Sequence, residues 1–297
     1  MSLVSRIVYL GLIGLAVGLI AWPLVELVVF NQSVFPNMMV FSLVAGSILG
    51  MVFGAGFGIS EGIIGQSVYK LVLGVPMGLL FGAIGGALGT LGGQAVLLLL
   101  GSRFFNTPNL FYSFGFPFSR SIGWAFFGVF IGAVEGIRSR SLIRLRNGLI
   151  GGAIGGFLGG LLFEYIKLLY PEAYIARLFG LGLLGVLIGI AYGLVEKKLS
   201  DASLYLLNGP QKGSEFLLTR QVTTLGKSAK EEIGLTMYND VEEKHIEITK
   251  VKDSFILTDA GTKTGTFVND DQIKKRKLKD GDVLRVGDAQ FQFRRKF

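Results

Sequence analysis

The sequence lacks cysteine and contains a single histidine, and both shortages exclude kinds of chemistry. Without cysteine the chain forms no disulfide, uses no thiolate nucleophile and binds no zinc through sulfur. With His245 as its one imidazole, a metal site made of several histidines is excluded as well. No motif places a nucleophile or an acid near His245. We therefore predict no catalytic site, no metal and no cofactor, and we expect that the protein is not an enzyme.

Charge is scarce in the first two-thirds of the chain. Residues 1–200 hold 12 of the 29 basic residues and 6 of the 21 acidic ones, whereas residues 201–297 have the charge density of an ordinary soluble domain. In a soluble protein the pI near 9.6 would suggest nucleic acid. Here, however, the basic residues of 1–200 cluster between apolar runs, as in a membrane protein of fixed orientation. We predict the lipid bilayer, and no nucleic acid, as a partner of this part.

Six apolar runs occupy the first part of the chain. They cover residues 7–30, 38–60, 74–101, 121–137, 148–169 and 176–196 approximately. Most reach or approach the roughly 20 residues that a membrane-spanning helix needs, and backbone groups in lipid must bond within the segment. The first run has no clear cleavage site and is followed by more such runs, so we interpret it as a retained helix. The sequence predicts an all-α transmembrane bundle of about six helices over residues 1–198.

The basic residues between the runs predict the orientation of this bundle. One side receives Arg6, Lys70, Arg138, Arg140, Arg144, Arg146, Lys197 and Lys198, and the other receives Arg103, Arg120, Lys167 and Arg177. Because basic residues accumulate on the cytoplasmic side, the bias of eight to four places both termini in the cytoplasm. We predict a multi-pass protein of the inner (plasma) membrane.

Glycine recurs at a spacing of four residues, which makes a flat helix face along which two backbones can approach. The pairs are Gly14 and Gly18, Gly78 and Gly82, and Gly152 and Gly156. The stretch 58–63 also matches the stretch 132–137 at an offset of 74 residues, and residues 193–196 are a weaker third copy. We predict three helical hairpins, each with a cytoplasmic glutamate.

Ionisable residues within or near the spans are candidates for function in a membrane protein. The acidic candidates are Glu26, Glu61, Glu135 and Glu164. Glu61 and Glu135 fall at helix ends, where a carboxylate can simply be hydrated, and Glu164 can be neutralised by Lys167 three residues later. Two readings stay open: a close-packed anchor, which we favour, and a transport path. The polar segment 102–120 is expected to be the longest external loop, with its aromatic residues at the membrane interface.

After Lys198 the pattern changes to short alternating segments separated by turn residues. Apolar residues alternate in 203–207, 215–219, 222–225, 245–248, 254–257, 266–268, 283–286 and 290–293. Short strands at this spacing predict an all-β sandwich over residues 199–297. Few residues separate it from the last apolar run, so the sandwich should lie close to the membrane.

The motifs of this second part resemble those of the forkhead-associated (FHA) family, in order and along nearly all of residues 203–295. Leu225–Ser228 resembles the family's Ile-Gly-Arg-Ser turn, and Val241–His245 resembles its Val-Ser-x-x-His. Residues 257–269 and 278–284 resemble its Leu-x-Asp…Ser-x-Asn-Gly-Thr-x-Val-Asn and Leu-x-x-Gly-Asp-x-Ile motifs. The resemblance implies a β-sandwich that reads phosphothreonine peptides through loops at one end.

Carried over residue by residue, the family's ligand-binding positions are Lys227, Glu242 and Thr264, and all three depart from its pattern. Lysine keeps the charge of arginine but loses its bidentate fork. Glutamate replaces a hydroxyl donor by an anion beside the phosphate, and Glu243 adds another. Threonine lacks the paired donor and acceptor of asparagine. We therefore predict that ordinary phosphothreonine recognition is lost.

The remaining positions divide into two groups. The partner-binding candidates are Lys227, Ser228, Glu242, Glu243, Lys244, Lys263 and Thr264. The resemblance implies a structural role in the loops for Gly226, His245, Gly265, Asn269, Gly281 and Asp282. The basic run 274–277 is interpreted as a solvated face, with contact to anionic headgroups as the alternative.

These patterns predict a membrane-anchored scaffold or signalling adaptor. Its cytosolic domain would bind a protein partner, such as a component of a Ser/Thr kinase and phosphatase system. The alternative is a channel or transporter regulated through that domain. A continuous polar path through Glu26 or Glu164 would favour the alternative, and a solid core would favour the adaptor.

Overall fold

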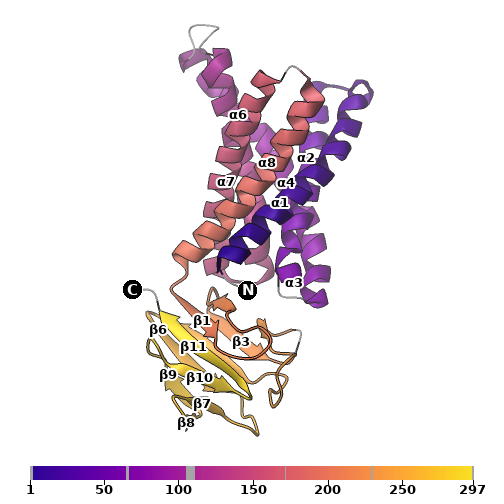
Figure 1. Cartoon of the computed structure of the whole chain (residues 1–297). Coiled ribbons are helices and arrows are strands. Elements are labelled where there is room, and N and C mark those ends of the chain that lie inside the picture. The colour runs from indigo at the N-terminus through magenta and orange to yellow at the C-terminus, as the bar shows by residue number, and fades with distance from the viewer. Residues whose placement is uncertain (1–2, 65–66, 105–110, 171, 229, 296–297) are drawn as a thin grey trace.

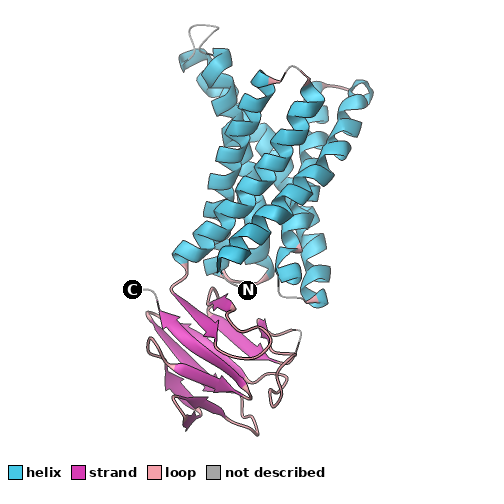
Figure 2. Ribbon diagram, in the orientation of Figure 1, coloured by secondary structure: helices cyan, strands magenta, loops and turns pink. Residues whose placement is uncertain are grey.

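In the computed structural model, which describes residues 3–64, 67–104, 111–170, 172–228 and 230–295, a helical bundle stands on a β-sandwich (Figure 1). Helices and strands are fully separated between the two parts (Figure 2). The long helices are α1 (Leu3–Phe30), α2 (Met38–Gly58), α4 (Val68–Phe104), α6 (Phe116–Arg138), α7 (Leu142–Leu169) and α8 (Ala173–Leu199). The short ones are η1 (Gln32–Val34), α3 (Ser60–Ile64) and the π-helical η2 (Phe111–Gly115).

All six long helices are long and apolar enough to cross a membrane. The prediction of six such helices followed by an all-β sandwich is therefore confirmed. Several helices begin before the apolar runs do, because polar residues near their ends remain helical and find partners. Lys70 and Arg144 lie within α4 and α7 in this way.

The expected loop 102–120 is much shorter in the structure. Residues 111–115 form η2 and residues 116–120 open α6, while residues 105–110 lie outside the described residues. Pro117 stands in the first turn of α6, where a proline is tolerated because its missing N–H has no helical acceptor. Phe114 stacks on Phe118, whose ring also meets Phe157 of α7, so these aromatics join neighbouring elements.

The six long helices form a closed ring. Each packs against its neighbours in chain order, and α1 closes the ring by packing against α8. Glycine faces make the tightest contacts: Gly54 of α2 meets Gly78 of α4, and Gly128 of α6 meets Gly152 of α7. The third pair is α1 with α8, which come from opposite ends of the helical part. A side chain at these glycines would overlap the facing backbone carbonyl, so only glycine permits this separation.

The sandwich consists of eleven strands in two sheets among the described residues. The strands are β1 (Ala202–Leu206), β2 (Glu215–Leu217), β3 (Val222–Gly226), β4 (Ile233–Gly234), β5 (Ile246–Val251), β6 (Ser254–Asp259), β7 (Thr266–Val268), β8 (Asp271–Ile273), β9 (Lys275–Lys277), β10 (Val283–Val286) and β11 (Ala289–Arg295). One sheet has the order β2-β1-β11-β10-β7-β8 and the other β4-β3-β5-β6-β9. Leu204, Leu225, Ile246 and Phe291 are fully buried between them.

Three strands were not expected from the sequence, namely β4, β8 and β9. Each has only two or three residues and no buried alternation to reveal it. The basic run 274–277 contains β9, and Arg276 in it pairs with Asp271 at 3.0 Å. Only residues 200–201 separate α8 from β1, and the sandwich lies against the end of the bundle (Figure 1).

Candidate functional site: recognition loops on a buried ionic anchor

Three loops meet at one end of the sandwich: β3–β4 (227–232), β4–β5 (235–245) and β6–β7 (260–265). The first two are joined by backbone bonds, since Lys227 N–H donates to the Glu242 carbonyl at 2.9 Å and Ser228 N–H to the Glu243 carbonyl at 3.1 Å. A side chain on Gly226 would strike the Glu243 carbonyl, so this close approach requires glycine. The three loops thus form one connected surface.

His245 braces these loops from inside the sandwich, where it is fully buried. Its Nδ1 accepts the backbone N–H of Glu242 at 3.1 Å, so the proton of the neutral ring lies on Nε2. Nε2 faces the Gly265 carbonyl and the Thr262 hydroxyl, both at 3.4 Å. A ring engaged on both nitrogens positions the backbone of two loops, and the sequence had implied this structural role.

The Glu242 carboxylate lies against the β6–β7 loop. Its Oε1 accepts the backbone N–H of Lys263 at 2.6 Å. The carboxylate therefore occupies a backbone amide donor next to Thr264, one of the three ligand-binding positions that the family resemblance implied. Glu243 next to it is exposed.

The basic candidates near this point differ in their engagement. Lys227 and Lys263 are exposed and form no ion pair among the described residues. Lys244 bonds to Glu247 at 2.9 Å, and this hydrogen bond raises the pKa of Lys244 and lowers the pKa of Glu247. Of the three lysine candidates, Lys227 and Lys263 consequently remain available to a partner.

Polar side chains hold the β6–β7 loop in shape. Thr264 donates its hydroxyl to the Asp240 carbonyl at 3.0 Å. The Asp259 carboxylate accepts from the N–H groups of Gly261 and Thr262 and from the hydroxyls of Thr262 and Thr266. Partial burial opposes ionisation of Asp259, but these hydrogen bonds hold its pKa below the ordinary value.

Of the other structural candidates, Gly265 ends the β6–β7 loop, and Asn269, Gly281 and Asp282 lie outside the three loops. Asn269 donates to Asp282 at 2.8 Å and accepts the Val283 N–H at 2.8 Å. Gly265 and Gly281 have positive φ angles of 72° and 85°, which explains glycine at these turns. The Asn269–Asp282 pair therefore joins the turn after β7 to the turn before β10.

Comparison with known proteins finds relatives of the sandwich. The sequence model of the family described as "Inner membrane component of T3SS, cytoplasmic domain" matches residues 205–296. The oxoglutarate dehydrogenase inhibitor of Corynebacterium diphtheriae is 33% identical over 84 residues, which are 28% of this chain and 58% of that protein. The glycogen accumulation regulator GarA of Mycobacterium tuberculosis is 31% identical over 87 residues, which are 29% of this chain and 53% of that protein.

The sandwich has the forkhead-associated (FHA) fold. The order of its motifs and its two-sheet architecture agree with this fold. A structure from a study of phosphothreonine-dependent FHA interactions is 26% identical and covers 33% of this chain and 99% of its own, with a TM-score of 0.31. The FHA domain of a Chlamydia trachomatis protein is 24% identical over 33% of this chain and all of its own, also with a TM-score of 0.31. The chain spans only between half and three-fifths of the curated relatives that it matches.

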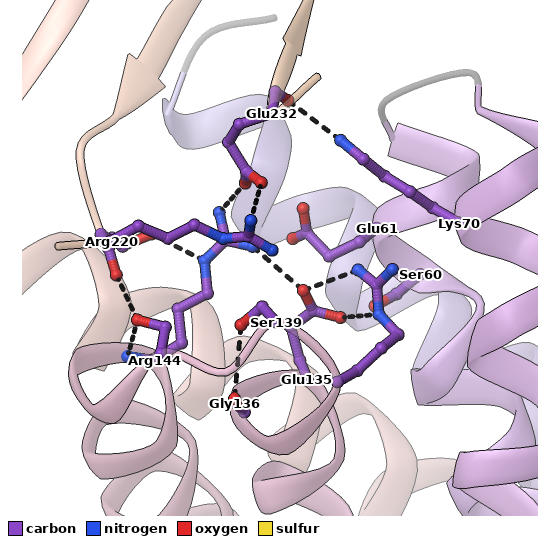
Figure 3. Close-up of polar contacts among 12 residues, drawn as sticks. Ser60, Glu61, Lys70, Glu135, Gly136, Ser139, Arg144, Arg220 and Glu232 are labelled. Atoms are coloured by element: carbon purple, nitrogen blue, oxygen red, sulfur yellow. Dashed lines mark hydrogen bonds and ion pairs between the residues drawn. The ribbon is translucent and has the colours of Figure 1, made fainter. Parts of the chain in front are cut away.

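The FHA domain is fastened to the bundle at Glu232, the last residue of the β3–β4 loop that begins with Lys227. The Glu232 carboxylate pairs with Arg144 of α7 and, at 2.9 Å, with Arg220. Its carbonyl accepts from the ammonium of Lys70 in α4 at 2.9 Å (Figure 3). One recognition loop therefore carries a partner-binding candidate at one end and a membrane-domain contact at the other.

Two further hydrogen bonds join the bundle to the loop between β2 and β3. Ser141 at the start of α7 donates its hydroxyl to the Thr219 carbonyl at 2.8 Å. Arg144 donates Nε to the Thr219 hydroxyl at 2.8 Å. Thr219 is 1% exposed, so these contacts are shielded from water.

Behind Glu232, a cluster of buried charges closes this end of the ring. Arg144 bonds to Glu135 at 3.0 Å (Figure 3). Arg6 pairs with Glu61 and, at 3.0 Å, with Glu196. The expectation that these glutamates are simply hydrated was wrong, because Glu61, Glu135 and Glu196 are 8%, 5% and 2% exposed. Buried carboxylates of this kind require such partners.

The pKa shifts of Glu232 and Arg220 show how burial and neighbouring charges act on this ion pair. Burial opposes ionisation of Glu232, but Arg144, Arg220 and Lys70 outweigh it and hold the pKa of Glu232 below its usual value. Burial lowers the pKa of Arg220 from that of a free guanidinium, although Glu232 favours its charge. The arrangement is a buried ion pair between the two parts of the chain.

Glu26 and Glu164 lie at the opposite end of the bundle. Arg177 donates to Glu26 at 2.5 and 2.7 Å, and Lys167 pairs with Glu164 at 2.6 Å, as the spacing of the latter two suggested. Between the two charged ends lies an apolar core that contains Leu49, Phe53, Phe127, Ile131, Phe163, Leu184 and Ile188. The side chains of this core are apolar and buried.

Sequence reasoning missed Arg144, Arg220, Glu232 and Thr219 as interface residues. Arg144 was read only as a determinant of orientation. One signal was present, since Ser67 with Lys70 and Ser141 with Arg144 repeat at the 74-residue offset. Glu232 and Arg220 carry no motif, and only the docking of the two parts identifies them.

Proposed function

We propose that the protein is a membrane-anchored adaptor whose FHA domain binds a protein partner without requiring phosphothreonine. The observation that carries this proposal is the bond from the Lys263 N–H to the Glu242 carboxylate. An internal carboxylate thus engages a donor of the recognition loops. The protein acts by binding and not by catalysis.

Electrostatics supports the loss of phosphate recognition. Two unit charges about 4 Å apart at an effective dielectric near 20 repel by roughly 4 kcal/mol. Such a term lowers affinity by about three powers of ten. Lys227 is a single point charge and does not restore the bidentate contact of an arginine. The acidic surface of Glu242 and Glu243 instead favours a partner segment that carries basic side chains.

The proposed partner is cytosolic, because the basic residues between the spans favour cytoplasmic termini. As the partner we propose a component of a Ser/Thr kinase and phosphatase system, since FHA domains commonly bind proteins of such systems. Affinity capture would be run on the full-length protein in nanodiscs and on its Glu242→Lys variant. The comparison would identify the proteins whose binding depends on the acidic residue Glu242.

A channel or transporter regulated by the FHA domain is the second candidate. The charged residues at both ends of the bundle are what favour it. The apolar core between those ends opposes it, since an ion would have to cross this region without polar partners. The anchor therefore remains the function that the geometry supports better.

Phosphopeptide titration tests the adaptor proposal. Full-length protein in nanodiscs should bind phosphothreonine peptides no more tightly than their unphosphorylated controls, as measured by fluorescence anisotropy. The variant Lys227→Arg, Glu242→Ser, Thr264→Asn should gain at least a tenfold preference for phosphate, because it removes one repulsive charge and restores a bidentate donor. A phosphate-dependent micromolar affinity of the natural sequence would contradict the proposal.

A further inference from the structure

The bundle contains a cavity of about 370 Å³ at the end remote from the FHA domain. All six long helices contribute to its wall, so it lies inside the ring. Its volume falls in the range of cavities that bind small organic molecules. The adaptor function does not use this space.

The charged part of the wall is cationic. Arg120, Lys167 and Arg177 line the cavity, and no acidic side chain does so among the described residues. The countercharges Glu164 and Glu26 pair with these cations without lining the cavity themselves. These three cations, set against the two carboxylates that pair with them, leave one positive charge in excess at the cavity.

Arg120 is the cation best suited to meet a ligand. It donates Nε to Glu164 at 3.1 Å, and its Nη groups form no hydrogen bond within the described part of the chain. Glu164 is 2% exposed and also accepts from Trp124 at 3.1 Å, so the carboxylate that holds Nε is itself buried, whereas the Arg120 side chain is 45% exposed. A guanidinium with unused donors is suited to a carboxylate or phosphate.

The rest of the wall is mainly apolar. Leu49, Phe127, Phe163 and Leu181 line the cavity and belong to the buried core that closes the ring below it. A small inorganic anion would leave this apolar surface without a partner, and a neutral hydrocarbon would leave the cations unmatched. An amphiphile satisfies both parts of the wall.

We propose that this cavity binds a single-chain amphiphile with an anionic carboxylate or phosphate headgroup. The headgroup lies at Arg120, Lys167 and Arg177, and the hydrocarbon chain extends toward Leu49 and Phe127. The bilayer around the bundle can supply such molecules directly. The site is independent of the partner that the FHA domain binds.

Tryptophan fluorescence provides a direct test, because Trp124 lines the cavity and Trp22 is the other tryptophan of the chain. Full-length Trp22→Phe protein is placed in nanodiscs of neutral phosphatidylcholine and titrated with brominated dodecanoate or brominated dodecyl phosphate. Contact with bromine quenches the indole, so we expect saturable quenching with at least one of the two. Comparison of the two distinguishes a carboxylate from a phosphate ligand.

Matched variants locate the ligand. Arg120→Gln should raise the dissociation constant at least tenfold, because a charged hydrogen bond is lost, whereas Arg146→Gln at the opposite end should leave it within twofold. Ala45→Phe narrows the cavity and should also weaken binding at least tenfold. Ala16→Phe adds the same ring to an exposed helix face and should not weaken binding of the ligand.

Three results would overturn the proposal. They are quenching that rises linearly without saturation for both anions, equal affinity for brominated dodecanol, and indifference of the affinity to both Arg120→Gln and Ala45→Phe. Circular dichroism melting of each variant confirms that the bundle is folded before the titration is interpreted.

Discussion

Glu232 has no place in any FHA motif, yet its carboxylate is the point at which the FHA domain and the bundle share a buried ion pair. It is bonded to two guanidiniums and its side chain is 8% exposed. Removing one partner of a buried pair costs about 3–5 kcal/mol, because the other charge remains buried and uncompensated. At the residue scale, this one side chain has the largest expected effect on how the two parts are held together.

The pKa of Glu232 predicts an acid dependence of docking. Since the folded pKa lies below the unfolded value of 4.5, the contribution is fully present above pH 4.5 and is lost as the pH falls through the lower folded value. Spin labels attached to the double variant Arg146→Cys, Lys252→Cys would report the distance between bundle and sandwich by pulsed electron paramagnetic resonance. We expect one narrow distance distribution at pH 7 that broadens well below pH 4.5.

The variant Glu232→Gln separates this residue from general acid unfolding. It should show the broad distribution already at pH 7, because Arg220 then lacks a charged partner. Glu231→Gln, at the neighbouring position that forms no ion pair among the described residues, is the matched control and should behave like the natural sequence. A narrow distribution for Glu232→Gln at pH 7 would show that other contacts hold the domain.

At the scale of elements, α1 and α8 have an unusual relation, because the first and last long helices close the ring. Gly14 of α1 meets Gly185 of α8, and a Cβ at Gly185 would overlap the Gly14 carbonyl. Gly182 lies one turn earlier on α8, and a Cβ there would meet only side-chain atoms of Leu15 and Leu19 at 3.2 and 3.9 Å. The two glycines therefore form a natural comparison.

We expect Gly185→Ala to destabilise the bundle by about 1–3 kcal/mol through overpacking. Gly182→Ala should be neutral or stabilise it by up to about 1 kcal/mol, since alanine favours helix over glycine. Thermal unfolding of both variants in the same detergent provides the comparison. Equal stability of the two would mean that α1 and α8 pack less closely than the structure shows.

Element boundaries also show what a sequence pattern can predict. The six apolar runs identified every long helix, because burial in lipid demands a continuous apolar segment. Helices α4 and α7 begin before their apolar runs and include Lys70 and Arg144, since charged residues that pair within the protein do not end a helix. Strands β4, β8 and β9 were not predicted, because two or three residues are too few to show an alternating pattern.

At the scale of the whole molecule, the orientation in the membrane can be tested with the chain's own lack of cysteine. Single cysteines introduced as Glu172→Cys, between α7 and α8, and Lys263→Cys, on the FHA domain, both lie at exposed positions. In intact cells a membrane-impermeant maleimide should label the first and not the second, because the basic residues favour a cytoplasmic FHA domain. The reverse pattern would invert the proposed location of the partner.

The whole molecule also joins parts that the sequence kept separate. The repeat at 74 residues sets Glu61 and Glu135 at matching places in the sequence, and the three hairpin repeats stay a prediction. It did not indicate that Arg6, at the start of the chain, pairs with both Glu61 and Glu196. That pairing requires the ring to close, which no local pattern describes.

The sequence by itself determined that the first part of the chain is apolar enough to cross a membrane and that the second part has the FHA fold. The length of an apolar run is a local property, and it decides whether a helix can cross the bilayer. The FHA motifs are local turns, and backbone geometry sets the residue types that they allow. Only the tertiary structure decided what the charges do. Whether a carboxylate such as Glu135, Glu232 or Glu242 meets water, an arginine or a backbone amide depends on which distant segment lies beside it, because electrostatic energy is set by distance and burial in space.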